Sequence, residues 1–289
     1  MSNKNVNNHS TVQLFNRSTA NCSTICKEIS ITGNGLMKNK PCTVTFFPSN
    51  EGKIRYFVKG QEAFTADVDN VLSTDHCVTL GTKKAKAMLE EHLSAAFAFC
   101  GIDSIDICMD EFEIPALDGS AKQWVELFKQ AGIEKSKPKY YTVSEPVYYL
   151  NGKTSLVILP SDELFISYAV NYDHPDLTRR WVNYNPKTPD EIIEARTFGF
   201  YKDLRKYQMF GFAQGVTIEN TVGLKDDGYT TELRSENEPI KHKILDLIGD
   251  LYLTGVNPLN LKAQILVKEA GHAVHVKVAK ILKDKLVEL

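Results

Sequence analysis

Alternating hydrophobic and polar residues predict β-strands in the first half of the chain. Residues 28–32 alternate in this way and are followed by the turn residues Gly33-Asn34-Gly35. Residues 42–47 and 53–58 continue the pattern on either side of a loop, and residues 105–109 alternate again further along. The first half is therefore predicted to be rich in strands.

Two helices are predicted among these strands. The alanines and leucines of residues 83–100 indicate a helix, and Gly101 is a typical residue to end it. Asp118-Gly119-Ser120 turns the chain into a second helix that runs to Phe128. Residues 132–139 are typical of a linker, so we expect a domain boundary there.

The second half repeats this order of strands and helices. Gly255 ends a predicted helix as Gly101 does, 154 residues later, and the same offset places His92 opposite Asp246. Two similar domains would explain the repetition, although any helix, glycine and strand unit would align in this way. The predicted elements are strands at 147–150, 155–159, 164–170, near 216 and at 263–267, and helices from 189, from 199, at 239–253 and after 271.

The composition is that of a globular protein with a sizeable core. Of 289 residues, 43% are hydrophobic and 24% are charged, which excludes a wholly disordered chain and agrees with two domains of ordinary size. The 34 Lys and Arg residues against 36 Asp and Glu residues give a net charge of −2. Because there is also no basic stripe, we expect no nucleic-acid partner.

Disulfides and membrane spans are not expected. The six cysteines are irregularly spaced in a chain long enough to do without cross-links, so we expect them to be reduced. No apolar run approaches the ~18 to 20 residues of a membrane helix.

Residues 1–26 hold no acidic residue and are predicted to be a flexible polar leader, with an organellar transit peptide as the alternative. Ordered structure should begin near Lys27.

His242 and Asp246 are candidate metal ligands. Their i, i+4 spacing in the predicted helix 239–253 puts them on one face with about 6 Å between Cβ atoms, which suits two ligands of a zinc ion. An ordinary hydrogen-bonded pair would show the same spacing. Asp250 extends this polar stripe along a largely apolar helix, so the three groups need partners.

A second polar group, Glu90-Glu91-His92, lies in the predicted helix 83–100. A catalytic zinc takes three protein ligands, and His92 could be the third. Successive helix residues diverge by about 100°, so Glu91 would not bind the metal beside His92 but could reach a metal-bound water as a general base. A surface glutamate pair next to a helix-capping or core histidine is the alternative.

His272 follows Gly271 where the last predicted helix begins. Backbone N–H groups converge at such a position, so this histidine could contact an anion or protonate a leaving amine. A helix-capping histidine is the alternative.

Taken together, five segments resemble those of one enzyme family. In order and approximate spacing they are similar to the UDP-3-O-acyl-N-acetylglucosamine deacetylases, the zinc amidases of lipid A biosynthesis. The resemblance extends from about Lys27 to the C-terminus. The segments are residues 91–93, 113–121, 195–200, 242–251 and 271–273.

The resemblance implies a fold and a metal site. The expected fold is α+β, with two similar domains whose helices are sandwiched between two sheets, at residues 27–134 and 140–289. The zinc ligands of the family correspond to His92, His242 and Asp246. They hold Zn²⁺ as the cofactor that the resemblance implies.

Further residues take catalytic roles by the same resemblance. Glu91 matches the general base, and His272 matches the histidine that protonates the departing amine. Thr197 matches a threonine that binds the oxyanion, Asp250 the carboxylate that orients the histidine, and Lys243 a basic residue beside the substrate.

An aromatic stretch at about 198–215 corresponds to the family's insert, which forms an apolar passage for the fatty acyl chain of the substrate. So many aromatic residues would be excessive for a solvated helix, and core packing is the alternative. Lys243 and Lys268 are candidates for phosphate recognition. The candidate residues of the passage are Phe198, Phe200, Tyr201, Leu204, Phe210 and Phe212.

Three residues depart from the family pattern. Glu90 adds a carboxylate beside the base, Met37 stands where a histidine is usual, and His275 stands where an asparagine is usual. None of them removes an assigned ligand or the base, so the departures bear on acyl preference and affinity.

The resemblance leads us to expect hydrolysis of the N-acetyl group of UDP-3-O-acyl-N-acetylglucosamine, giving the free amine and acetate. We expect a monomer in the cytoplasm. The alternatives are a zinc amidase of the same fold that acts on another N-acetylated sugar, and a non-catalytic scaffold that keeps zinc for stability.

Overall fold

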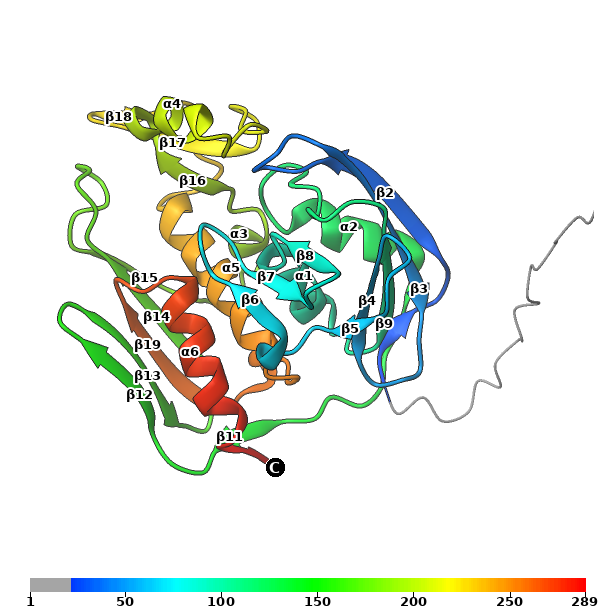
Figure 1. Ribbon diagram of the computed structural model, residues 1–289. Coiled ribbons are helices and arrows are strands. Elements are labelled where there is room, and N and C mark those ends of the chain that lie inside the picture. Colours follow the sequence, from blue (N-terminus) through cyan, green and yellow to red (C-terminus); the bar gives the residue numbers. More distant parts are fainter. Residues whose placement is uncertain (1–21) are drawn as a thin grey trace, which may run out of the picture.

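Each half of the chain forms a five-stranded sheet, and the computed structural model describes residues 22–289 (Figure 1). The first sheet has the strands β2 (Ile29–Asn34), β3 (Pro41–Pro48), β4 (Ile54–Val58), β5 (Phe64–Thr65) and β9 (Ile105–Met109). The second has β12 (Val147–Asn151), β13 (Thr154–Pro160), β14 (Phe165–Val170), β15 (Arg180–Asn183) and β19 (Ala263–Lys268).

The two sheets share one topology. The strand orders are β2-β3-β9-β4-β5 and β12-β13-β19-β14-β15. The central strand, β9 or β19, is antiparallel to β3 or β13 and parallel to β4 or β14. This equivalence confirms the predicted α+β class with two similar halves.

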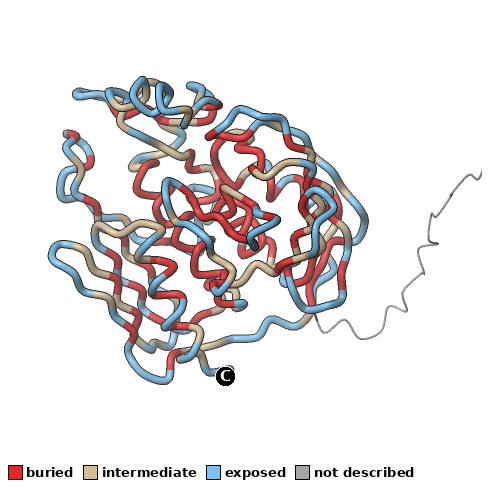
Figure 2. Tube along the Cα trace, in the orientation of Figure 1, coloured by how far each residue is buried: buried red, intermediate tan, exposed pale blue. Residues whose placement is uncertain are grey.

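Two helices lie side by side between the sheets, α1 (Glu91–Cys100) and α5 (Glu238–Tyr252) (Figure 1). They are accompanied by α2 (Lys122–Ala131) in the first half and by α6 (His272–Lys283) in the second. Every residue of α5 is buried, and the buried part of the chain is concentrated around these central helices (Figure 2). Polar side chains on α5 therefore lie inside the protein.

Smaller elements complete each half. One three-stranded sheet contains β6 (Val71–Ser73), β7 (Thr79–Gly81) and β8 (Lys86–Met88), and the other contains β16 (Thr197–Phe200), β17 (Thr221–Lys225) and β18 (Gly228–Tyr229). Two short strand pairs are β1 (Thr24–Ile25) with β10 (Ile133–Glu134), and β11 (Tyr141–Val143) with β20 (Leu286–Glu288). The remaining helical segments are α3 (Asp190–Ile193), α4 (Tyr201–Met209), η1 (Val68–Asn70) and η2 (Pro258–Asn260).

The helix predicted for residues 83–100 is wrong in its first part. Lys86–Met88 forms strand β8, paired with β7, and the helix starts only at Glu91. The alanines suit a helix, but their alternation with exposed Lys86 also suits a strand, and pairing with β7 decides the outcome. Gly101 ends α1 in the left-handed conformation, as predicted.

The ordered fold also begins earlier than the expected Lys27. Thr24 and Ile25 are buried and pair with β10, so part of the predicted leader belongs to the first half, while residues 1–21 lie outside the described part. The division into domains at 27–134 and 140–289 stays a prediction. Within residues 22–289, no helix is long and apolar enough to cross a membrane.

Candidate active site

The three predicted metal ligands meet where α1 and α5 cross. His92 comes from α1, and His242 and Asp246 come from adjacent turns of α5; a ligand atom of each lies within 4.8 Å of the others. Asp246 Oδ1 is 3.2 Å from His242 Nε2 and 3.7 Å from His92 Nε2. Among the described residues this buried oxygen has no hydrogen-bond partner. Such an orphaned oxygen between two imidazoles fits a divalent cation such as zinc.

The other polar atoms of His242 and Asp246 make hydrogen bonds that fix these side chains. His242 Nδ1 is 3.0 Å from the carbonyl oxygen of Ala195, so Nδ1–H donates there and Nε2 is left to bind a metal. Lys243 Nζ donates to Asp246 Oδ2 at 2.6 Å. Burial alone would raise the pKa of Asp246, but His242 and Lys243 hold it well below its usual value. Burial and His242 lower the pKa of His92 to about 3, so its ring stays neutral and able to bind a metal.

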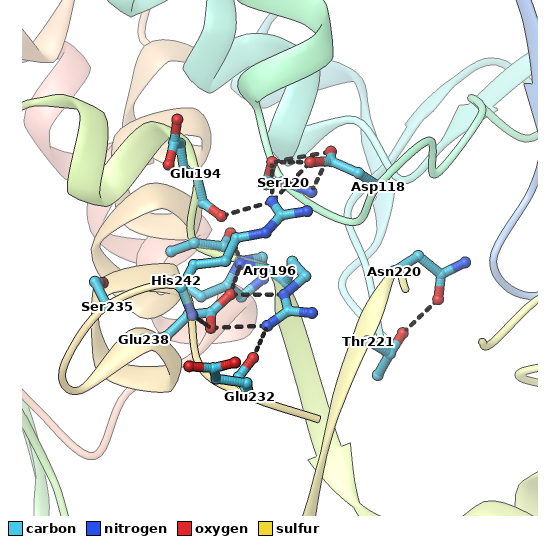
Figure 3. A network of polar contacts seen from close by, with 12 residues as sticks. Asp118, Ser120, Glu194, Arg196, Asn220, Thr221, Glu232, Ser235, Glu238 and His242 are labelled. Carbon is cyan, nitrogen blue, oxygen red and sulfur yellow. Dashed lines mark hydrogen bonds and ion pairs between the residues drawn. The ribbon is translucent and has the colours of Figure 1, made fainter. Parts of the chain in front are cut away.

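A buried ion pair fixes the peptide group that carries the Ala195 carbonyl, because the backbone N–H of Arg196 in the same peptide donates to Glu238 Oε1 at 2.9 Å (Figure 3). The guanidinium of Arg196 donates to both oxygens of Glu238, at 2.9 and 3.1 Å. Arg234 donates to Asp118 at 2.7 Å and so connects this network to the first half of the chain. The network therefore orients the partner of His242 and joins the two halves at this point.

Glu91 begins α1 and faces the metal triad. Its Oε2 accepts a hydrogen bond from the backbone N–H of Val78 at 2.9 Å, and its Oε1 is 3.7 Å from His272 Nε2. Burial raises the pKa of Glu91 to about 7, against the opposing effect of His272. A carboxylate with a pKa near neutrality is suited to general-base chemistry.

His272 lies at the first position of α6 and faces Glu91. Its Nδ1 is 2.8 Å from Asp250 Oδ2, which leaves Nε2 directed toward Glu91 and Asp246. Burial alone would lower the pKa of His272, but Asp250 and Glu91 raise it to about 9. The ring can therefore hold a proton at neutral pH and donate it.

A glycine that the sequence analysis missed allows the helices to approach so closely. A Cβ at Gly249 of α5 would overlap the carbonyl oxygen of Glu91 on α1. Only a residue without a side chain fits at this crossing. Gly249 therefore brings Glu91 of α1 close to the polar residues of α5.

A cavity of about 460 Å³ opens beside these groups, and both halves of the chain line it. Several predicted residues line this cavity, including Thr197, Lys243 and His272. Five of the six predicted residues of the apolar passage do so as well: Phe198, Phe200, Tyr201, Leu204 and Phe212.

Two predicted substrate contacts are not at the cavity. Phe210 follows α4 and is 70% exposed, away from the cavity lining. Lys268 is an exposed residue of β19, whose buried residues Ala263, Ile265 and Val267 face the helices. Because side chains alternate along a strand, Lys268 points to the opposite face of the sheet. Its assignment to phosphate recognition stays a prediction, which this placement outside the cavity does not support.

Other residues of the cavity were missed. His76 and Leu89 come from the first half, and the His76 ring lies 5.3 Å from that of Tyr207 and 5.6 Å from that of Phe212. No local motif signals this contact, because it joins a loop to a distant segment. Tyr172 also lines the cavity and packs on Phe198.

The three departures noted in the sequence occupy different places. Met37 lines the cavity, and its backbone N–H is held by Glu113. Glu90 is fully buried outside the cavity lining, where Ser94 and Tyr56 contact Oε1. Burial raises the pKa of Glu90 well above its usual value. His275 is buried behind Asp250.

Comparisons with known proteins agree on one family. The family model described as UDP-3-O-acyl N-acetylglycosamine deacetylase matches residues 22–284. A protein named UDP-3-O-acyl-N-acetylglucosamine deacetylase from Leptospira biflexa is 34% identical over 278 residues, covering 91% of this chain and 90% of its own. Proteins of the same name from Trichormus variabilis and Geotalea uraniireducens are 32% and 33% identical, covering 89% and 88% of this chain and 96% and 85% of their own.

Proposed function

The chain belongs to the UDP-3-O-acyl N-acetylglycosamine deacetylase family, and we propose that it hydrolyses the N-acetyl group of UDP-3-O-acyl-N-acetylglucosamine in lipid A biosynthesis. The observation that carries the proposal is the placement of Glu91 and His272 beside the triad of His92, His242 and Asp246. Glu91 Oε1 and His272 Nε2 are 3.7 Å apart. Amide hydrolysis needs a base for the attacking water and an acid for the departing nitrogen.

We assign the metal site to Zn²⁺, held by the two imidazoles and the carboxylate of this triad. Two nitrogen ligands and one oxygen ligand match a catalytic zinc site, which keeps a further position open. When bound, Zn²⁺ would supply Lewis acidity toward the amide carbonyl and the attacking water.

Side chains of the protein carry out the proton transfers and stabilise the developing charge. Glu91 takes a proton from water as the water oxygen bonds to the acetyl carbon. The Thr197 hydroxyl donates a hydrogen bond to the carbonyl oxygen, which becomes negatively charged. His272 gives a proton to the nitrogen as the C–N bond breaks, so that the products are acetate and the free amine. Asp250 holds His272 through Nδ1.

The aromatic part of the cavity is suited to the acyl chain. No residue of α4 is buried, although Tyr201 and Leu204 line the cavity. Core packing therefore does not account for these side chains, and a bound alkyl chain would cover them. Contacts there would position the acetamide from a distance, because the acyl chain does not take part in the chemistry.

Acetate release by the purified protein tests the proposal. UDP-3-O-(hydroxyacyl)-N-acetylglucosamine is the substrate, assayed with a zinc chelator and after Zn²⁺ is restored. Turnover that the chelator abolishes and Zn²⁺ restores would support both the reaction and the metal. The matched control is UDP-N-acetylglucosamine, which lacks the acyl chain. Equal turnover of the two substrates would contradict the acyl assignment, and no turnover by the zinc-loaded protein would contradict the function.

A further inference from the structure

Asp250 accepts hydrogen bonds from two histidines on the same oxygen. Its Oδ2 is 2.8 Å from His272 Nδ1 and 2.7 Å from His275 Nδ1. Its other oxygen, Oδ1, is buried and has no hydrogen-bond partner among residues 22–289. The orientation of this carboxylate within the protein therefore depends on the two histidines.

The two histidines have different surroundings. His272 lines the cavity and directs Nε2 toward Glu91. His275 has 0% exposure and is absent from the cavity lining. It therefore cannot contact a substrate, and any effect on catalysis must pass through Asp250.

The far side of His275 is fixed by Tyr168. The Tyr168 hydroxyl lies 3.0 Å from His275 Nε2 and 2.8 Å from the carbonyl oxygen of Ala270, and its one proton can be donated to either acceptor. Tyr168 is fully buried on β14, and Ala270 lies in the loop just before α6. One hydroxyl therefore connects the second sheet with both His275 and the loop that leads to His272.

Within the described part of the chain, no side chain caps the beginning of α6. Gly271 precedes the helix and offers no capping side chain, and both histidines lie in the first helical turn. Asp250 on α5 thus holds this turn through two donors. Loss of the His275 donor would leave Asp250 with one partner, and the carboxylate could then rotate.

We propose that His275, fixed by Tyr168, is a positioning residue for deacetylation, which holds Asp250 so that Asp250 aims His272 Nε2 at the reacting nitrogen. This inference rests on the proposed function. In this arrangement Asp250 Oδ2 accepts from the cavity histidine His272 and is held by a second donor, His275 Nδ1.

Steady-state kinetics of zinc-loaded variants test the inference. H275L removes the donor, and kcat should fall about 10- to 100-fold, as is usual for groups that orient a catalytic side chain, while KM changes little. H275N keeps an N–H donor close to the position of Nδ1 and should retain most of kcat. Y168F should lose less than H275L, because it loosens His275 without removing it.

A second mutation separates positioning from general destabilisation. In an H272A background, H275L should cost no further activity, because His275 acts only through His272. V278A removes buried volume elsewhere on α6 and should lower Tm without changing kcat. Metal content should equal that of the wild type in each variant. An unchanged kcat in H275L, or an equal loss in the H272A background, would overturn the inference.

A spectroscopic measurement tests positioning without turnover. Nuclear magnetic resonance of full-length protein labelled with ¹⁵N-histidine reports the Nδ1–H of His272. In H275L this signal should shift or broaden, and in H275N it should stay near its wild-type position. An unchanged signal in H275L would refute the positioning role even in a protein that releases no acetate. If the protein releases no acetate but the His272 signal shifts in H275L, the proposed function would be contradicted and the positioning role of His275 would stand.

Discussion

His272 Nε2 lies 3.7 Å from Glu91 Oε1, although the two residues come from opposite halves of the chain. Each affects the protonation of the other. His272 lowers the pKa of Glu91, which burial raises, while Glu91 helps to raise that of His272. The pair can therefore hold a deprotonated base and a protonated acid at the same pH.

The pH dependence of kcat/KM should be bell-shaped. Activity should rise as pH increases through the pKa of Glu91, about 7, since the base must lose its proton. It should fall as pH increases through the pKa of His272, about 9, since the acid must keep its proton. A cation bound nearby would lower the pKa of both groups, so the rise and the fall in activity would both move to lower pH. A pH–rate profile measures this, and a rate that does not vary between pH 5 and 10 would be inconsistent with both roles.

Glu91→Gln should abolish most turnover while leaving the metal bound. The amide oxygen of glutamine can still accept the Val78 hydrogen bond, but the side chain cannot take a proton. The expected loss in kcat is about 10²- to 10⁴-fold. Glu126→Gln is the control and should behave as wild type, because Glu126 is an exposed residue of α2. Retention of wild-type kcat by the Glu91 variant would refute its assignment as the base.

His242→Ala and Asp246→Ala should both lose zinc, but with unequal effects on stability. Removal of Asp246 also leaves the buried Lys243 ammonium without its partner at 2.6 Å, which should cost about 3 kcal/mol or more in the free energy of unfolding. Metal analysis and denaturant unfolding of the metal-free proteins measure the two effects. Full zinc occupancy in either variant would contradict the ligand assignment.

Gly249→Ala should separate α1 from α5. The added Cβ overlaps the carbonyl oxygen of Glu91, so the variant should lose about 1 to 3 kcal/mol of stability together with activity. Gly228→Ala is the control, because a Cβ there meets nothing within 4 Å. Thermal unfolding and acetate release compare them, and equal Tm values for the two variants would show that the crossing tolerates a side chain.

Leu204→Ser should weaken use of the acylated substrate. Leu204 lines the cavity on α4, and loss of its apolar surface should cost about 10-fold in kcat/KM. Met209→Ser on the same helix is the matched control, because Met209 is 86% exposed and does not line the cavity. Equal effects of the two substitutions would count against an acyl passage along α4.

Local pattern was sufficient for features that depend on neighbours in sequence. Helical periodicity alone places His242 and Asp246 on one face, and Gly101 ends α1 because glycine tolerates the left-handed conformation. The outward placement of Lys268 was also predictable, since the alternation of Ala263–Lys268 puts its side chain opposite the buried residues.

Contacts between distant segments could not be predicted from local sequence patterns. Residues 86–88 have the composition of a helix, yet pairing with β7 makes them a strand. His76 reaches the aromatic residues of the cavity only through the packing of two loops, and no spacing along the chain indicates this. Strand pairing and loop packing depend on the whole fold, which a local pattern does not contain.

The sequence by itself determined the family and the residue types of the candidate site, because these follow from motifs in order, and the resemblance to the family implied the two similar α+β halves. Only the tertiary structure decided how α1 and α5 cross at Gly249, which oxygen of Asp250 the two histidines share, and which aromatic residues line the cavity. These features depend on distances of a few ångströms between segments far apart in the chain, and such distances are set by packing.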